Sequence, residues 1–292
     1  MTEQEIRSAL AQAAGDVREK NPQAPSVTNT VTQDFVANAQ LAVGGSATMI
    51  YLPDECEQIA ATAPAFYINT GTMLPVLAET LPRTAKTLHD NRTPWVLDPV
   101  GIGMNGLRTK ILSGFKDCKP SIVRGNASEI IALAKLWQLV DDDYAGTIRG
   151  VDSTEKVSAA KTAAIALAKF TGGAVAVSGE EDLITDGEQT IICAGGSAML
   201  TKVTGSGCAL GGVMAVYAAV ANPFTAALTA TTAFNLAGMQ AAAKSDGPAS
   251  FKIKFLDALY KLTAQEIADS FRAVGVLDSM LTYTFGMERV KE

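Results

Sequence analysis

Short apolar runs alternate with helical patterns over residues 33–177, and this alternation restricts the folds open to the chain. The apolar runs predict strands over residues 47–52, 65–69, 95–97, 121–124 and 174–177. The patterns between them predict helices over residues 33–43, 54–60, 75–91, 108–117, 127–139 and 154–170. The predicted strands are rich in Val and Ile, which is typical of strands covered on both faces. Strand–helix alternation builds βαβ units, so we expect an α/β fold with a central, mainly parallel sheet flanked by helices.

Further elements are expected on both sides of this region. A helix over residues 3–20 precedes it, and a hairpin of residues 183–185 and 190–193 follows it, turning at Asp186-Gly187. From Gly207 to about residue 274 the pattern is helical. Because there is no internal repeat and no linker, we expect one domain spanning residues 1–292. The pattern assigns no structure to its tail, residues 275–292.

A run of 41 positions between Lys202 and Lys244 contains no charged residue. Asn222-Pro223 divides it, and the first half, residues 208–221, is shorter than the roughly 20 residues that a membrane span needs. The second half is rich in Ala and Thr and includes two amide side chains. The run therefore predicts two helices buried in the core of a soluble protein rather than a membrane protein.

Charge, cysteine and histidine content exclude several classes of function. The net charge is −6, so no basic surface for nucleic acid or an anionic membrane is expected. His89 is the single histidine and no cysteines form a CxxC pair, which excludes a zinc finger. His89 ends a predicted helix without a Ser or Cys motif beside it, so we expect an exposed helix-capping residue. The scattered cysteines and the absence of a secretion signal predict a cytoplasmic protein.

Four of the predicted strands end in a polar residue that glycine follows closely. These residues are Asn69, Asp98, Arg124 and Ser178. In parallel sheets, ligands bind beyond the carboxyl ends of the strands. Glycine lets the connecting loops approach a ligand closely, so we expect these side chains to surround one ligand site.

Asp98 and Glu129 lie 31 positions apart, which is the length of one βαβ unit. Both carboxylates are therefore expected at the same end of the sheet. Such a pair suits Mg²⁺, which takes one or two carboxylates together with waters and phosphates. Two structural alternatives stay open: Asp98 could cap a turn before Pro99, and Asn126 could form a capping box with Glu129.

The segment Thr204-Gly205-Ser206-Gly207-Cys208 opens the first charge-free helix. A glycine-rich turn before a helix presents free N–H groups and the positive end of the helix dipole. We therefore expect an anion hole at Gly205, Ser206 and Gly207. The segment is neither a Walker A loop nor a dinucleotide-binding fingerprint. With Arg124 and two acids at other strand ends, phosphoryl transfer is the favoured class of reaction.

Together these segments resemble the hydroxyethylthiazole kinase family of the ribokinase-like superfamily. The matching motifs run in family order to about residue 265; they are 27–29, 42–49, 97–101, 124–129, 149–152, 182–187, 201–210 and 247–251. The resemblance implies a ribokinase-like three-layer sandwich that assembles as a homotrimer with active sites between subunits. It also implies ATP-dependent phosphorylation of the hydroxyl of 4-methyl-5-(2-hydroxyethyl)thiazole, with Mg²⁺, in the salvage route to thiamine diphosphate.

The resemblance also implies roles for residues that match the family motifs. Arg124 and Ser178 would hold the ATP phosphates, and Asn29 would lie near them. Asp98 and Glu129 would arrange the metal and its waters.

On the substrate side, Met49 would line the thiazole pocket and Gly205 would contact the substrate. Cys208 would face the substrate hydroxyl, where related sugar kinases carry an Asp base. Because Cys208 opens a helix, we expect the dipole to lower its pKa below about 8.5, and we expect it to accept the hydroxyl proton late. The sequence departs from the family at Pro25-Ser26, usually a His or another polar pair, and at Ser178, usually Thr.

The main alternative is a related kinase of another small heterocyclic alcohol, of the hydroxymethylpyrimidine or pyridoxal type. Those kinases typically carry Asp at the position of Cys208, which disfavours this assignment. A non-catalytic ATP-binding protein of the same fold would be expected to lack Asp98, Arg124 or the glycine-rich turn, and all are present.

Overall fold

The computed structural model describes residues 1–104, 106–141, 153–271, 273–278 and 282–283. Within them the strands form one sheet in the order β10-β9-β8-β7-β6-β5-β4-β3-β1-β2. The parallel strands are β1 (Gln23–Val27), β2 (Ser46–Met49), β3 (Phe66–Asn69), β4 (Trp95–Asp98), β5 (Ile122–Asn126) and β6 (Ala174–Ser178). The antiparallel extension consists of β7 (Glu181–Thr185), β8 (Gln189–Ala194), β9 (Ala273–Asp278) and β10 (Thr282–Tyr283).

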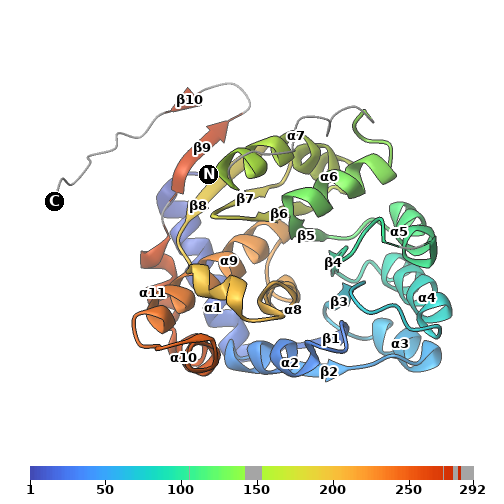
Figure 1. The fold of residues 1–292 in the computed structure, drawn as a ribbon, viewed down its shortest axis with the longest axis horizontal. Helices are drawn as coiled ribbons and strands as arrows, with labels where there is room; N and C mark the ends of the chain where they lie inside the picture. The colour runs from blue at the N-terminus through green and yellow to red at the C-terminus, as the bar shows by residue number, and fades with distance from the viewer. Residues whose placement is uncertain (105, 142–152, 272, 279–281, 284–292) are drawn as a thin grey trace.

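Helices cover both faces of this sheet (Figure 1). One face carries α1 (Glu3–Lys20), α2 (Gln33–Ala42), α8 (Ser206–Ala218), α9 (Pro223–Ala242), α10 (Pro248–Lys261) and α11 (Ala264–Ser270). The other carries α3 (Pro53–Ala60), α4 (Leu77–Asp90), α5 (Gly106–Cys118), α6 (Ala127–Leu136) and α7 (Ser153–Thr171). The predicted three-layer α/β architecture is therefore confirmed.

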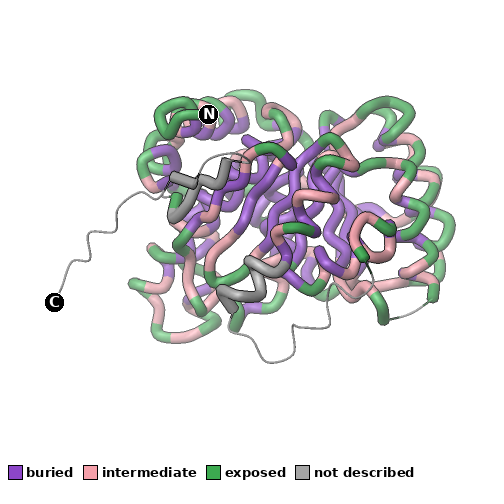
Figure 2. Tube along the Cα trace, turned by 90° about the horizontal axis from the view of Figure 1, so that it is seen from above, coloured by how far each residue is buried: buried purple, intermediate pink, exposed green. Residues whose placement is uncertain are grey.

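Successive strand residues supply the two hydrophobic cores, one on each face of the sheet. On β3, Tyr67 joins the core under α8 and α9, whereas Phe66 and Ile68 join the core under α3–α7. Val96 and Leu97 of β4 divide in the same way. This is the period-2 geometry of a strand covered on both faces, and Figure 2 shows the buried chain running through the middle of the molecule.

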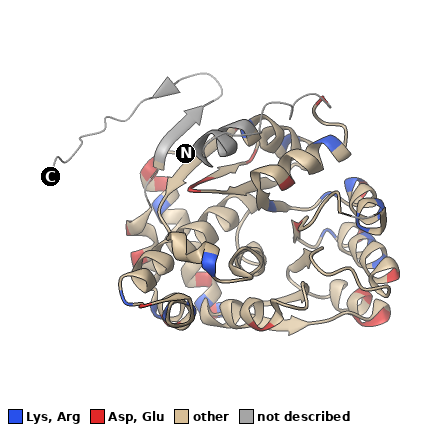
Figure 3. Ribbon diagram, in the orientation of Figure 1, with Lys and Arg blue, Asp and Glu red and all other residues tan. Residues whose placement is uncertain are grey.

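The charge-free run forms α8 and α9, as predicted, and nearly all of α8 and most of α9 are buried. Small residues let neighbouring elements approach the α8 backbone. A Cβ atom at Gly211 would lie 2.6 Å from the ring of Tyr67 on β3. None of the helices among the described residues is long and apolar enough to cross a membrane. Figure 3 shows charges of both signs spread mainly over the outer helices.

Strand β1 is absent from the sequence prediction, which assigned nothing between residues 21 and 33. Pro25 lies inside it and has no N–H to donate, so the pattern did not indicate a strand. The structure accommodates Pro25 because pairing with β3 starts only at Ser26, opposite Tyr67. Gln40 of α2 also anchors the strand, since its Nε2 donates to the carbonyl oxygen of Ala24 at 3.0 Å.

The end of the chain also differs from expectation. The helical prediction to residue 274 is wrong at its end, since α11 stops at Ser270 and β9 starts at Ala273. Much of the predicted tail, residues 279–281 and 284–292, lies outside the described residues.

The first helix packs against the last one. Arg7 of α1 donates two hydrogen bonds to backbone oxygens of the C-terminal segment, to Ala268 at 2.7 Å and to Phe271 at 2.9 Å. The buried side chains of Leu10 and Ile267 belong to the same core beneath this contact. The two ends of the described chain are therefore folded together.

Candidate functional site

Buried polar side chains gather where β3, β4 and β5 end, against the first turn of α8. Asp98, the last residue of β4, is fully buried. Its Oδ2 accepts hydrogen bonds from Tyr67 Oη at 3.0 Å, Asn69 Nδ2 at 2.9 Å and Arg124 Nη1 at 3.2 Å. Its Oδ1 is also buried and has no partner among the described residues. The protein thus holds one carboxylate oxygen firmly and leaves the other for a further ligand.

Arg124 connects this carboxylate to the next strand and to α8. Its Nη2 donates to Ser178 Oγ at the end of β6, at 3.1 Å. A Cβ atom at Gly207 would lie only 2.6 Å from Nη2, so the guanidinium lies against the helix backbone where glycine leaves room. The Nε of Arg124 is buried without a partner in the described part of the chain. The arrangement is that of a cation prepared to bind an anion at the helix start.

The first turn of α8 supplies backbone donors to the same place. Gly205 is the N-cap residue with φ of 87°, a left-handed conformation that favours glycine. The N–H and hydroxyl of Ser206 already donate to backbone oxygens, including that of Val203. The N–H groups of Gly207 and Cys208 donate to no acceptor among the described residues. The N–H of Gly205 likewise donates to no acceptor among the described residues, so of the three residues predicted to form an anion hole only Ser206 has its N–H occupied.

Cys208 is buried, and its Sγ accepts a hydrogen bond from Asn69 Nδ2 at 3.3 Å. Burial raises the pKa of the Cys208 thiol, and the Asp98 carboxylate raises it further. The Thr32 hydroxyl and Arg124 oppose this shift without reversing it. The expectation that the helix dipole lowers this pKa is wrong, because burial outweighs it. Cys208 is therefore a neutral thiol at neutral pH.

Burial also governs the acidity of Asp98. It raises the pKa of this carboxyl to about 6, although the Arg124 guanidinium opposes the shift. The Glu129 carboxylate raises the pKa of Asp98 as well, so the two acids lie close enough to repel one another.

Glu129 forms the capping box that the sequence left open as an alternative. Its Oε2 accepts from the backbone N–H of Asn126 at 2.9 Å, and Asn126 Oδ1 accepts from the N–H of Glu129 at 3.0 Å. This pair starts α6 and holds Glu129 beside Gly125 at the end of β5. Only Oε2 of the carboxylate accepts a hydrogen bond from the residues that the structure describes, so the capping role and a role towards a ligand are compatible.

Asn29 and Met49 lie farther along the same edge of the sheet. Asn29 follows β1, and its Oδ1 accepts from Thr72 Oγ1 at 2.9 Å; it makes no hydrogen bond to Arg124 or Ser178. Met49 is the last residue of β2 and is half-buried; two strands, β3 and β1, lie between β2 and β4 in the sheet. At about 4.8 Å between strands, the strand of Met49 lies about 14 Å from that of Asp98.

Tyr67 joins the site although the sequence did not predict it, whereas Asn69 was predicted at the site as a strand-end residue but without a role. They are two positions apart on β3 and therefore point to the same face. That face lies towards α8. In the sequence, only Gly211 of α8 indicated this contact, because it leaves room for the Tyr67 ring. His89 lies exposed in the last turn of α4, as predicted.

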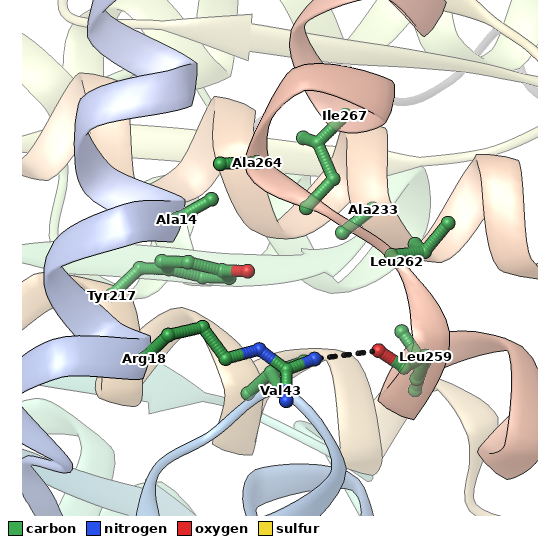
Figure 4. Close-up of a pocket in the computed structure, with 9 residues that line it drawn as sticks. All are labelled: Ala14, Arg18, Val43, Tyr217, Ala233, Leu259, Leu262, Ala264 and Ile267. Atoms are coloured by element: carbon green, nitrogen blue, oxygen red, sulfur yellow. Dashed lines mark hydrogen bonds between the residues drawn. The ribbon is translucent and has the colours of Figure 1, made fainter.

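A separate cavity lies at the opposite end of α8, near Tyr217 (Figure 4). Its volume is about 10 Å³, which is room for about one water. The Arg18 side chain crosses it and donates to the carbonyl oxygen of Leu259 at 3.1 Å. This cavity is too small for an organic substrate and serves packing between helices.

Comparisons with known proteins point to one family. The model described as the hydroxyethylthiazole kinase family matches residues 15–265. The hydroxyethylthiazole kinase of Bifidobacterium adolescentis is 51% identical over 275 residues, covering 91% of this chain and 94% of that protein. That of Citrobacter koseri is 41% identical over 261 residues, covering 89% and 97%.

Solved structures agree with these matches. The hydroxyethylthiazole kinase protein from Pyrococcus horikoshii OT3 superimposes with a TM-score of 0.79 at 29% identity, covering 92% of this chain and 98% of that one. The pyridoxal kinase from Staphylococcus aureus in complex with AMP-PCP and pyridoxal has a TM-score of 0.54 at 16% identity, covering 75% and 88%. The likeness to the Staphylococcus aureus pyridoxal kinase shows a common fold only.

Proposed function

The chain belongs to the hydroxyethylthiazole kinase family, and we propose from this that it transfers the γ-phosphoryl group of ATP to the hydroxyl of 4-methyl-5-(2-hydroxyethyl)thiazole. The product, a thiazole phosphate, would serve thiamine diphosphate synthesis. The observation that carries the mechanism is the position of Arg124 beside Gly207, whose N–H, like that of Cys208, has no acceptor among the described residues.

Those donors suit the chemistry of phosphoryl transfer. Charge in the transition state spreads over the oxygens of the transferred group, and donors already in position stabilise it without rearrangement. Arg124, the α8 N-terminus and the Ser178 hydroxyl would hold the phosphates. The buried Nε of Arg124, which has no partner among the described residues, supports a role in binding an anion.

Asp98 and Glu129 fit Mg²⁺. The buried Oδ1 of Asp98 has no partner in the described part of the chain. Burial raises the pKa of Asp98 and the Glu129 carboxylate adds to this, and a divalent cation would favour the charged form against both. Mg²⁺ takes one or two carboxylates and completes its shell with phosphates and waters. When bound, it would neutralise charge on the phosphates of ATP.

Cys208 would position the substrate hydroxyl and accept its proton late in the transfer. A loose transition state needs little proton removal early, so a neutral thiol is sufficient. The alternative of a hydroxymethylpyrimidine or pyridoxal kinase is disfavoured by Cys208, where those kinases typically carry Asp. The likeness to the Staphylococcus aureus pyridoxal kinase concerns the fold alone.

The two substrates would lie side by side along the carboxyl edge of the sheet. The thiazole would lie near Met49 and Gly205, towards β2 and β1, and the ATP phosphates towards β5 and β6. Asn29 follows β1, on the thiazole side, and would contact the phosphates from there. The order of strands supports this division, because β3 and β4 separate the two ends.

We also propose a homotrimer with active sites between subunits. Strand β2, which carries Met49, is at the edge of the described sheet, and large apolar side chains lie exposed around it. They are Val31, Leu41 and Leu52, with 71%, 54% and 62% of their surface exposed.

One continuous sheet supports a single kinase domain over residues 1–292. The free cysteines support a cytoplasmic location.

The decisive experiment measures ADP release with ATP and Mg²⁺ on three alcohols: the thiazole, hydroxymethylpyrimidine and pyridoxal. We expect the highest kcat/KM on the thiazole, by at least tenfold. A higher value on either of the other alcohols would overturn the proposed substrate while leaving the kinase class intact. No ADP release on any alcohol would overturn the proposed reaction.

A further inference from the structure

Asn69 contacts both reactive groups of the site at once. Its Nδ2 lies 2.9 Å from Asp98 Oδ2 and 3.3 Å from Cys208 Sγ. It is also 3.0 Å from Tyr67 Oη, which itself donates to Asp98 Oδ2. Since Tyr67 Oη and Asp98 Oδ2 are neighbours, they can share one amide hydrogen, which leaves the other for Cys208.

The orientation of this amide is determined by the loop that follows. Asn69 Oδ1 accepts from the backbone N–H of Gly71 at 2.9 Å. That bond requires the oxygen on the Gly71 side, so Nδ2 faces Asp98 and Cys208. The loop is tightly packed, because a Cβ atom at Gly71 would lie 2.9 Å from Asn69 Oδ1 and 2.5 Å from Asn29 Nδ2.

We propose that Asn69 is a positioning residue that holds the Cys208 thiol in register with the Asp98 carboxylate, and that the Asn69–Gly71 bond sets its direction. This inference rests on the proposed function, in which Asp98 faces the metal and phosphates and Cys208 faces the alcohol. Through one amide, the acceptor hydroxyl and the phosphoryl group would be placed relative to each other. Such alignment of reacting groups contributes strongly to catalysis.

The hydrogen bond from Asn69 to Cys208 also affects the reactivity of the thiol. The Asn69 N–H donates to sulfur, and a hydrogen bond to the charged form of a group favours that form. The amide therefore makes the buried thiol more reactive than burial alone would leave it. This effect is measurable without any substrate.

The first test replaces Asn69 with Leu, which has nearly the same shape but no donor. Iodoacetamide modification of Cys208, followed by peptide mass spectrometry at pH 8, should slow about tenfold, the loss expected for one hydrogen bond to a charged group. This measurement uses no alcohol or ATP, so its outcome is independent of the proposed reaction. An unchanged rate in a folded variant would overturn the contact with sulfur.

The second test is a double-mutant cycle on the alcohol that the wild type phosphorylates. Asn69→Leu should lower kcat about tenfold or more, with little change in the KM for ATP. In the Cys208→Ala background, the factor by which Asn69→Leu lowers kcat should be at least three times smaller than in the wild type, because the effect of Asn69 acts partly through the thiol. Equal losses in both backgrounds would show a merely structural role and overturn the proposal.

Gly71→Ala is a second variant that tests the proposal if Asn69→Leu does not fold. It preserves every polar group but places a methyl against Asn69 Oδ1, so it should slow modification of Cys208 in the same direction. Gly15→Ala is the matched control, since a Cβ there meets nothing within 4 Å and α1 is remote from the site. An effect of Gly71→Ala no larger than that of Gly15→Ala would overturn the role given to the Asn69–Gly71 bond.

Discussion

Replacing Asp98 by Asn should make the protein more stable at neutral pH while removing most of its activity. The carboxyl has a pKa of about 6 in the fold, against 3.8 for an ordinary Asp, because it is buried. A raised carboxyl pKa means that the folded state binds the proton more tightly than the unfolded state. The stability this provides is complete below about pH 4 and is lost as the pH rises through 6.

The size of the effect follows from the two pKa values. A tenfold difference in proton affinity corresponds to about 1.4 kcal/mol, so the ionisation of Asp98 should remove about 3 kcal/mol of stability between about pH 2.5 and 7.5. Asn has nearly the same shape and does not titrate. As the pH rises over this range, the unfolding free energy of Asp98→Asn minus that of the wild type should therefore increase by about 3 kcal/mol.

Urea unfolding followed by tryptophan fluorescence measures this difference, because Trp95 and Trp137 are both buried. Comparing the two proteins at each pH cancels the other titrating groups. Turnover of the variant should fall about 100-fold or more, as when a residue that stabilises the transition state is removed. A stability difference that does not change with pH would refute the reasoning about Asp98, whatever happens to the activity.

Four further variants test other parts of the site. Glu129→Gln should keep the capping box, changing stability by less than about 1 kcal/mol in thermal unfolding, yet lower turnover; wild-type turnover would contradict the metal role. Gly207→Ala places a methyl 2.6 Å from the Arg124 guanidinium and should raise the KM for ATP about tenfold or more, whereas an unchanged KM would exclude phosphate binding there. At saturating ATP, Cys208→Asp should match or exceed wild-type turnover, Cys208→Ser should keep measurable turnover and Cys208→Ala should lose most of it; equal rates in all three would end the catalytic role. If the proposed trimer forms, Leu52→Glu should dissociate it in sedimentation and lower turnover, and a fully active monomer at micromolar concentration would contradict a shared active site.

The fold was predictable where local signals agreed with one another. The first helix has the predicted bounds, Glu3–Lys20, because a capping box of Thr2 and Glu5 starts it and Asn21 ends it in a left-handed conformation. Strand β1 could not be predicted because Pro25 is a strong local signal against a strand. Its place depends on pairing with β2 and β3, which is a property of the whole sheet.

The candidate site was predictable to a similar extent. Asp98, Arg124 and Ser178 could be found because the ends of neighbouring parallel strands meet at one edge. Asn69 could be placed at the site by the same argument, but its contacts with Asp98 and Cys208, and the acidity of Cys208, depend on what packs above the sheet. The helix dipole is visible in the sequence, but the burial that outweighs it arises only when α8 lies against the sheet.

The contact between α1 and α11 determines how far this chain can be shortened. The family match covers residues 15–265, so Arg7 and both of its hydrogen-bond acceptors fall outside it. Trimming the protein to the matched region would remove most of α1 and most of α11 together. The inner surfaces of α9 and α1 that these segments cover would then face water, and apolar surface newly exposed in this way promotes aggregation. Helices α1 and α11 are remote from the candidate site. Together they cover the end of the hydrophobic core to which α8 belongs.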